Sequence, residues 1–333
     1  MSLTYAKAGV DIDAGELLVQ RIKRSAESTF TKSVLNGIGA FGAFYDARFK
    51  GYRAPVLVSS VDGVGTKLKI AQLANRYDTV GQDLVNHCVN DIAVCGARPL
   101  FFLDYFATGR LDVGVAASVI RGFSKACKQN GCSLIGGETA EMPGFYTDGE
   151  YDVAGMIVGV VERRKIVDGA RIRRGDLMIG VPSSGLHTNG YSLARRVLLS
   201  KFAVDEYIPQ LKSTLADALL TVHRSYYWVI SRLNARTAVH GFSHITGGGI
   251  VGNTMRVVPK GLNLQIDWDS WHRPPIFELI QALGNVPEAD MRRTFNLGVG
   301  LVVIVPRTKA SKTLSFLKAM REKAFVMGEV VSA

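Results

Sequence analysis

The sequence predicts a protein of two domains, each a mixed α/β or α+β fold in which helices cover a sheet. Its 333 residues are enough for two domains of ordinary size. Apolar, strand-like runs alternate with helix-like runs along the whole chain, which is typical of sheets with helices packed on them. The chain becomes basic and glycine-punctuated between residues 163 and 176, and we therefore divide it into residues 1–167 and 168–333.

The first domain is expected to begin with a helix and a long loop. Leu17, Leu18 and Ile22 fall on one face of a helix, and residues 29–54 have the composition of a loop with short extended pieces. The elements expected after this loop are strands at 55–62, 99–107, 132–136 and 151–161, and helices at 66–76, 80–96 and 112–130.

The second domain repeats the alternation of strands and helices. Its expected strands are 176–182, a short one near 237–240, 261–267, 297–305 and 324–332. Its expected helices are 190–201, 213–233, 250–257, 275–284 and 308–321, with a glycine loop at 246–249.

Composition favours a cytoplasmic protein without a membrane partner. Apolar residues make up 47% and charged residues 21% of the chain, as in globular proteins. No apolar run approaches the roughly 18 residues of a membrane helix, and Met1–Lys7 lacks the apolar core of a signal peptide. No two of the four cysteines form a C-x-x-C pair, so we expect no zinc site.

The net charge of +11 is the unusual bulk property of the chain. The basic residues are scattered, and most are expected to be solvated surface charge. Binding of phosphorylated metabolites is the next interpretation. A nucleic-acid partner is not expected, because no stripe of basic residues interleaved with aromatic residues is present.

Two glycine-rich clusters that carry carboxylates indicate nucleotide chemistry. Asp62-Gly63-Val64-Gly65-Thr66-Lys67 and Gly136-Gly137-Glu138 each follow a strand-like run. Carboxylates suit Mg²⁺, and backbone amides exposed by glycine suit phosphate. A plain turn would explain Asp and Gly, but it does not need Thr66 and Lys67 at the helix start.

The helix expected at 80–96 has a polar face formed by Asp83, His87, Asn90 and Asp91. Two amide- or imidazole-bearing residues are unusual on a solvated helix face, which makes Asp91 a second candidate metal ligand. His87 by itself is more often structural. After the double glycine we favour Glu138 over Glu141 as a ligand, because the backbone there opens to a phosphate.

Two further loops in the second domain are candidates for anion binding. Gly185–Ser192, with His187 and Asn189, precedes a helix, and Thr246-Gly247-Gly248-Gly249 precedes another. Ordinary loop-to-helix geometry would also explain them, but three successive glycines exceed the needs of a turn. The Gly37–Gly42 match to G-x-G-x-x-G follows a poor strand and precedes no helical stripe, so we interpret it as a glycine-rich loop.

These motifs, in this order, resemble those of the phosphoribosylformylglycinamidine cyclo-ligase family, the aminoimidazole ribonucleotide synthetases of purine biosynthesis. The resemblance runs nearly end to end and includes Phe101–Tyr105 with Asp104, Asp152–Gly155 and Arg293–Gly300 with Asn296. It implies a ferredoxin-like N-terminal domain that closes a β-barrel in a homodimer, and a C-terminal α/β sandwich domain.

The resemblance also implies a reaction and the residues that serve it. ATP phosphorylates the formyl oxygen of formylglycinamidine ribonucleotide, an amidine nitrogen attacks, and phosphate leaves as the ring closes. Mg²⁺ would lie on Asp62, Asp91 and Glu138. The residues expected to hold ATP are Asp11, Asp13, Lys23, Gly63, Gly65, Thr66, Lys67, Asp104, Gly136 and Gly137. Those expected to hold the substrate are His187, Asn189, Thr246, Gly247, Gly248, Gly249 and Asn296, with His187, Lys23 and Asp62 as catalytic residues.

One departure and three alternatives remain open at this point. The family often has Glu-Asn-hydrophobic-Pro-Arg where this chain reads Gly252-Asn253-Thr254-Met255-Arg256. A thiamine-phosphate kinase or a selenophosphate synthetase would use the same scaffold, although residues 1–30 lack the reactive Cys of the latter. A basic, non-catalytic nucleic-acid-binding protein would leave the acidic motifs unexplained.

Overall fold

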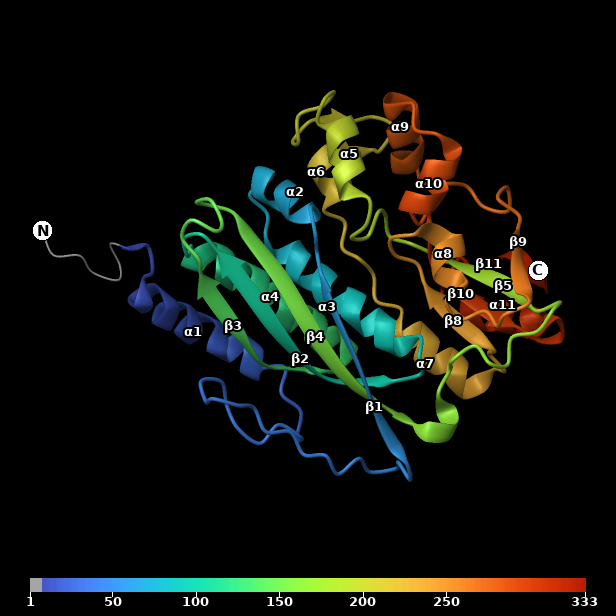
Figure 1. The fold of residues 1–333 in the computed structure, drawn as a ribbon, viewed down its shortest axis with the longest axis horizontal. Coiled ribbons are helices and arrows are strands. Elements are labelled where there is room, and N and C mark those ends of the chain that lie inside the picture. Colours follow the sequence, from blue (N-terminus) through green and yellow to red (C-terminus); the bar gives the residue numbers. More distant parts are fainter. Residues whose placement is uncertain (1–7) are drawn as a thin grey trace, which may run out of the picture. The chain divides into compact units, whose positions relative to one another are not determined.

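The computed structural model describes residues 8–333, which form two compact units (Figure 1). The first unit contains residues 8–92 and Pro99–Glu162, and the second contains Ala93–Arg98 and Arg163–Ala333. Residues 1–7, in which we looked for a signal peptide, lie outside the described residues. Within residues 8–333, no helix combines the length and apolar character that crossing a bilayer requires.

The first unit is built on a four-stranded mixed sheet. Its strands have the order β1-β4-β2-β3, with β1 antiparallel to β4 and β2 parallel to β3. The elements are α1 Ile12–Glu27, β1 Pro55–Gly63, α2 Lys67–Leu73, α3 Asp78–Ala93, β2 Arg98–Thr108, α4 Val113–Asn130, β3 Ser133–Glu141 and β4 Tyr151–Glu162.

The connectivity of this sheet differs from the ferredoxin-like arrangement that the resemblance implied. A ferredoxin-like chain runs β-α-β-β-α-β, whereas this one runs β-α-α-β-α-β-β after α1. The reason is that α4 carries the chain back to place β3 parallel to β2, and β4 then inserts between β1 and β2. The unit is therefore a mixed sheet, and the ferredoxin-like expectation is wrong.

Helices α3 and α4 cover one face of this sheet (Figure 1). Phe102 of β2 packs against Phe123 of α4 with ring centroids 6.0 Å apart, and Cys88 of α3 donates to the carbonyl of Gly155 in β4 at 3.5 Å. The edge strand β1 alternates in burial, and its Leu57 and Val61 are 61% and 65% exposed. Apolar side chains therefore remain uncovered along β1 in a single chain.

The second unit is built on a five-stranded antiparallel sheet of order β8-β10-β5-β11-β9, which makes it α+β. Its core contains Met178, Val302, Ile304, Met327 and Val330. The main elements are β5 Leu177–Pro182, α5 Tyr191–Leu198, α6 Leu215–Leu219, α7 Tyr227–Arg236, β8 Gly241–His244, α8 Gly249–Thr254, β9 Leu262–Ile266, α9 Pro275–Gly284, α10 Glu288–Thr294, β10 Val299–Val305, α11 Ala310–Ala319 and β11 Phe325–Ser332. A hairpin of β6 Tyr207–Ile208 and β7 Ser213–Thr214 and the 3₁₀ turns Arg163–Lys165 and Arg307–Lys309 complete it.

The helix expected at 213–233 is wrong, because residues 220–226 separate α6 from α7 without helical structure. The hydroxyl of Thr221 donates to the Asp217 carbonyl at 2.9 Å, and the Val222 carbonyl accepts from the Ser184 hydroxyl at 2.6 Å. Side chains thus take hydrogen bonds that a helix would have formed. The strand expected near 237–240 lies at Gly241–His244, and α10 was not expected at all.

Helices α3 and α4 approach each other through glycine. A β-carbon built on Gly81 would lie 2.1 Å from the Val119 carbonyl oxygen, and one on Gly122 would lie 2.4 Å from the Asp78 carbonyl oxygen. Such contacts are shorter than real side chains tolerate, so the two backbones require hydrogen at both positions.

We expect Gly81→Ala to lower the free energy of unfolding of the first unit by about 1–3 kcal/mol, because the added methyl group overpacks the helix contact. The measurement is urea denaturation followed by circular dichroism. Gly15→Ala is the matched control, since Gly15 of α1 has open space around it and alanine favours helix. Equal stability of the two variants would contradict the close approach.

Candidate active site

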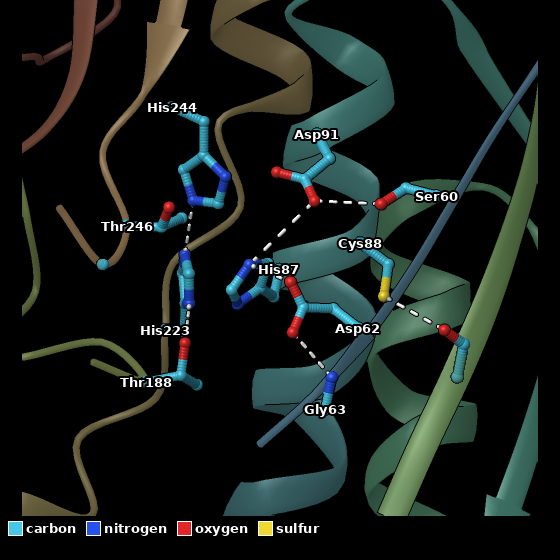
Figure 2. A network of polar contacts seen from close by, with 12 residues as sticks. Ser60, Asp62, Gly63, His87, Cys88, Asp91, Thr188, His223, His244 and Thr246 are labelled. Atoms are coloured by element: carbon cyan, nitrogen blue, oxygen red, sulfur yellow. Dashed lines mark hydrogen bonds and ion pairs between the residues drawn. The ribbon is translucent and has the colours of Figure 1, made fainter. Parts of the chain in front are cut away.

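The end of β1 carries the acidic network of the first unit (Figure 2). Nε2 of His87 on α3 lies 2.9 Å from Oδ2 of Asp62 and 4.0 Å from Oδ2 of Asp91. The hydroxyl of Ser60 donates to Asp91 at 3.0 Å, and Oδ1 of Asp62 accepts the Gly63 N–H at 2.7 Å. Two of the three expected metal ligands are therefore neighbours, held together by the imidazole of His87.

The oxygen atoms of this network suit a magnesium ion. Carboxylate and hydroxyl oxygens are hard donors, and Asp62 and Asp91 keep 41% and 29% of their side chains exposed. His87 lies between the two carboxylates. Burial lowers its pKa, but the hydrogen bond to Asp62 and the charges of Asp91, Asp62 and Asp83 outweigh burial and raise the pKa above its ordinary value.

The polar face of α3 is buried rather than solvated. Asp83 and Asn90 are fully buried, and His87 is 5% exposed. The ammonium of Lys67 lies 2.7 Å from Asp83, and both side chains have no exposed surface. Lys67 starts α2 as expected, but its charge is used inside the unit and does not face the solvent beside Asp62.

Glu138 lies apart from Asp62 and Asp91 within one chain. Asp62 is on edge strand β1 and Glu138 on edge strand β3, with β4 and β2 between them. Three strand spacings amount to about 14 Å. Glu138 is paired in the sheet with Tyr105, whose side chain is exposed, so both point away from the helices. Asp62 points towards α3, and the side chains of Glu138 and Asp62 therefore lie on opposite faces of the sheet. Within one chain, the structure therefore does not bring Glu138 to Asp62 and Asp91.

A cavity of about 930 Å³ opens beside β3 in the first unit. It brings together five residues expected to bind ATP or its metal: Asp11, Asp104, Gly136, Gly137 and Glu138. The Gly37–Gly42 loop, whose nucleotide-binding reading we set aside, also lines it. The volume is in the range of small-molecule sites. Lys23 and Asp13, on the exposed surface of α1, are not among its lining residues.

The carboxyl groups that line this cavity differ in hydrogen bonding, exposure and pKa. Glu141 accepts the backbone N–H groups of Asp11 and Leu111, both at 2.7 Å, and so anchors the start of α1. Glu138, which we favoured over Glu141 as a ligand, is exposed. Burial raises the pKa of Asp104 to about 7, so this carboxyl group titrates near neutral pH.

In the second unit, the two expected anion loops meet. A β-carbon built on Gly247 would lie 3.1 Å from Oδ1 of Asn189, so the loop after β5 touches the loop after β8. Nδ2 of Asn189 is buried and has no hydrogen-bond partner within the described residues. A buried amide nitrogen without an acceptor costs about 1–3 kcal/mol, and a phosphate oxygen would satisfy it.

Asn253 holds the Thr246–Gly249 loop by hydrogen bonds, a role that the sequence did not lead us to expect. Its Nδ2 donates to the carbonyls of Thr246, Gly247 and Gly249 at 3.1, 3.2 and 2.8 Å, and its Oδ1 accepts the Thr246 hydroxyl at 3.0 Å. Asn253 stands in the segment that departs from the family pattern. The sequence feature that could have indicated this role is an asparagine four residues after Gly249, which lies one helical turn from the loop.

Asn296 and His187 define the other loop. Asn296, which we expected to bind substrate, is buried, donates to the Gly185 carbonyl at 2.9 Å and accepts from the Ser183 hydroxyl and the Gly298 N–H. Its amide therefore holds the loop in this conformation. His187 has φ +64°, a left-handed conformation that costs a residue with a β-carbon on the order of 1 kcal/mol. Such conformations cluster at functional loops.

Comparison with known proteins covers almost the whole chain. Residues 50–161 match the family described as AIR synthase related protein, N-terminal domain, and residues 173–333 match its C-terminal domain. A phosphoribosylformylglycinamidine cyclo-ligase of Sorangium cellulosum (strain So ce56) is 55% identical over 100% of this chain and 96% of its own length.

Two solved structures share the fold at low identity. Thiamine-monophosphate kinase from Stenotrophomonas maltophilia K279a has a TM-score of 0.68 at 18% identity, covering 95% of this chain and 93% of its own. The hydrogenase maturation protein HypE in complex with ATP has a TM-score of 0.64 at 17% identity, covering 96% of this chain and 85% of its own.

We expect His87 to make stability depend on pH in metal-free buffer. Because the folded-state pKa is raised, the stabilisation is fully present below the unfolded value of about 6.5 and is lost as pH rises through the folded value. The measurement is the unfolding free energy of wild type minus that of His87→Asn from pH 5 to 9. Exposed His272→Asn is the control. A difference that stays constant or grows with pH would contradict the shift.

Proposed function

Because the chain belongs to the phosphoribosylformylglycinamidine cyclo-ligase family, we propose that it closes the imidazole ring of aminoimidazole ribonucleotide at the expense of ATP. The substrate is formylglycinamidine ribonucleotide, and the reaction belongs to purine biosynthesis in the cytoplasm. The observation that supports this proposal is that each unit brings together residues expected to bind one of the two phosphorylated reactants. The first unit has carboxylates and a nucleotide-sized cavity, and the second has two glycine-rich loops that touch each other.

On the nucleotide side, the residues of β1 and α3 would bind metal and those beside β3 would bind ATP. Asp62 and Asp91 would hold Mg²⁺, which neutralises charge on the phosphates when bound. The amides of Gly65 and Thr66 follow Asp62 closely in the chain and suit phosphate oxygens, whereas the Gly63 N–H is donated to Asp62. Asp11, Asp104, Gly136 and Gly137 line the cavity, and Asp13 and Lys23 on α1 complete the set that we assign to ATP.

On the substrate side, the two loops would hold the ribose phosphate and place the reacting groups. Thr246–Gly249 offers backbone amides at the start of α8, and Asn189 offers its buried Nδ2. His187 lies on the same loop as Asn189 and is assigned to the reacting end. Phosphorylation turns the formyl oxygen into a good leaving group, after which the amidine nitrogen closes the ring with loss of phosphate.

We also propose that the protein is a homodimer whose N-terminal sheets face each other in a barrel. An edge strand with exposed apolar side chains is a liability in a monomer and an asset in an interface. Leu57 and Val61 of edge strand β1 are such side chains, and Tyr105 of the interior strand β2 is also exposed. Residues 1–167 would then provide ATP binding and dimerisation, and residues 168–333 substrate binding.

A kinase of the same fold is the second candidate. The likeness to thiamine-monophosphate kinase supports it, although 18% identity carries the fold alone. The full-length identity of 55% to a cyclo-ligase, against 18% to the kinase, favours the cyclo-ligase. The activity assay separates the candidates, since thiamine phosphate and formylglycinamidine ribonucleotide are different substrates.

We expect the purified protein to form aminoimidazole ribonucleotide from formylglycinamidine ribonucleotide, ATP and Mg²⁺, and to stop when EDTA removes the metal. Asp62→Asn should lower kcat at least about 100-fold while changing stability by less than about 1 kcal/mol, because it removes a charged oxygen ligand without removing volume. Product is measured by the colour of its diazotised amine. Absence of product from folded wild type would refute the function. Equal losses of activity and stability in Asp62→Asn would show that Asp62 serves only the structure of the turn.

We expect Val61→Glu to convert a dimer into a 36.1 kDa monomer in sedimentation experiments, because it places charge in the apolar face of β1. Leu283→Glu, on a half-exposed residue of α9, is the matched control and should leave the mass unchanged. A wild-type protein that sediments as a monomer at micromolar concentration contradicts the proposed interface.

A further inference from the structure

Three of the six histidines of the chain gather in the interior of the second unit. They are His187 on the loop after β5, His223 between α6 and α7, and His244 at the end of β8. Their exposed fractions are 1%, 0% and 6%, and ring nitrogens of all three lie within 4.8 Å of one another. The proposed function uses His187 and leaves the other two without a role.

His223 is the central member of this cluster. Its Nε2 lies 2.9 Å from Nε2 of His244, and its Nδ1 lies 3.4 Å from the hydroxyl of Thr188 (Figure 2). Its ring also stacks on that of His187, with centroids 4.0 Å apart and planes 14° from parallel. These contacts constrain the orientation of the His223 imidazole.

These contacts connect the two loops that form the proposed substrate site. His187 and Thr188 belong to the loop that also carries Asn189. His244 ends β8 and is followed after one residue by Thr246–Gly249. The loops meet directly where Asn189 approaches Gly247, and the buried His223 joins them a second time.

The hydrogen bonds through His223 are coupled. In two neutral imidazoles, only one Nε2 of the His223–His244 contact carries hydrogen. If it is that of His223, Nδ1 accepts from the Thr188 hydroxyl. If it is that of His244, Nδ1 of His223 donates to Thr188 and leaves the hydrogen of the hydroxyl available to another acceptor. The tautomer of His223 therefore decides what Thr188 offers beside His187.

A shared metal ion fits this geometry poorly. A ligated metal lies close to the plane of each imidazole that binds it, about 2.0–2.1 Å from the nitrogen. The rings of His187 and His223 are nearly parallel and stacked, so no point lies in both planes beside both nitrogens. Hydrogen bonding and stacking account for the cluster in the observed conformation.

We propose that His223 is a positioning residue for ring closure. Through the chain Thr188–His223–His244 and the stack on His187, it holds residues 185–190 against residues 246–249 at the spacing that the substrate needs. The inference rests on the proposed function for what the loops bind, but the coupling of the two loops does not depend on that.

The experiment compares His223→Phe, which keeps a flat ring for stacking, with His223→Gln, whose amide reaches towards His244. Removing both hydrogen bonds should lower kcat about 10-fold or more and raise the KM for formylglycinamidine ribonucleotide, with the KM for ATP unchanged. Gln should recover part of the loss. Exposed His272→Phe is the matched control and should behave as wild type.

A second measurement tests the coupling without the reaction. In His223→Phe, backbone amides of residues 185–190 and 246–249 should exchange hydrogen with solvent faster than in wild type, while those of β10 do not change. Thr188→Val, which leaves the buried ring in place, should loosen residues 185–190 in the same way. If wild type forms no product, this measurement still decides the inference, and the failure belongs to the proposed function.

Two results would overturn the inference. One is wild-type kcat and wild-type amide exchange in His223→Phe. The other is one transition-metal ion per chain that disappears in His223→Phe, detected by elemental analysis and by the absorption of Co²⁺, because a metal site would then explain the cluster.

Discussion

The first unit depends on the ion pair between Lys67 and Asp83. Both side chains are completely buried, and each would cost several kcal/mol to leave without its partner. The pair therefore fixes the first residue of α2 against the middle of α3. Since Lys67 follows Asp62 by five residues, the same constraint holds the end of β1 over α3 and keeps Asp62 beside His87.

Burial of the middle of α3 is the wider consequence. Gly81 lets α4 approach to backbone contact, and Cys88 lies under β4. From Thr79 to Asn90 every residue of α3 is buried, so the polar side chains in this stretch must find partners within the fold. The acidic network at β1 is one result, because the carboxylates of Asp62 and Asp91 share the imidazole of His87.

In the second unit, side-chain amides and imidazoles hold the candidate loops in place. Asn253 holds the glycine loop by its three carbonyls, and Asn296 holds the loop that carries His187. Both loops are polar backbone that must be satisfied when it is not helical or extended. The two amides satisfy part of it, and the Gly249 N–H at the start of α8 donates to the Thr246 carbonyl at 3.2 Å.

The sequence by itself determined the strand and helix alternation, the membership of a family and the candidate loops, because these follow from local patterns of apolar residues, glycine and acid. Only the tertiary structure decided which candidates meet. Strand order separates Glu138 from Asp62, and burial turns Lys67 inward. Residues 220–226 are not helical, because the hydroxyls of Ser184 and Thr221 donate to the carbonyls of Val222 and Asp217. This non-helical segment places His223 against His187 and His244. Contacts between residues far apart in the chain have no local signature, and for that reason they appear only in the folded protein.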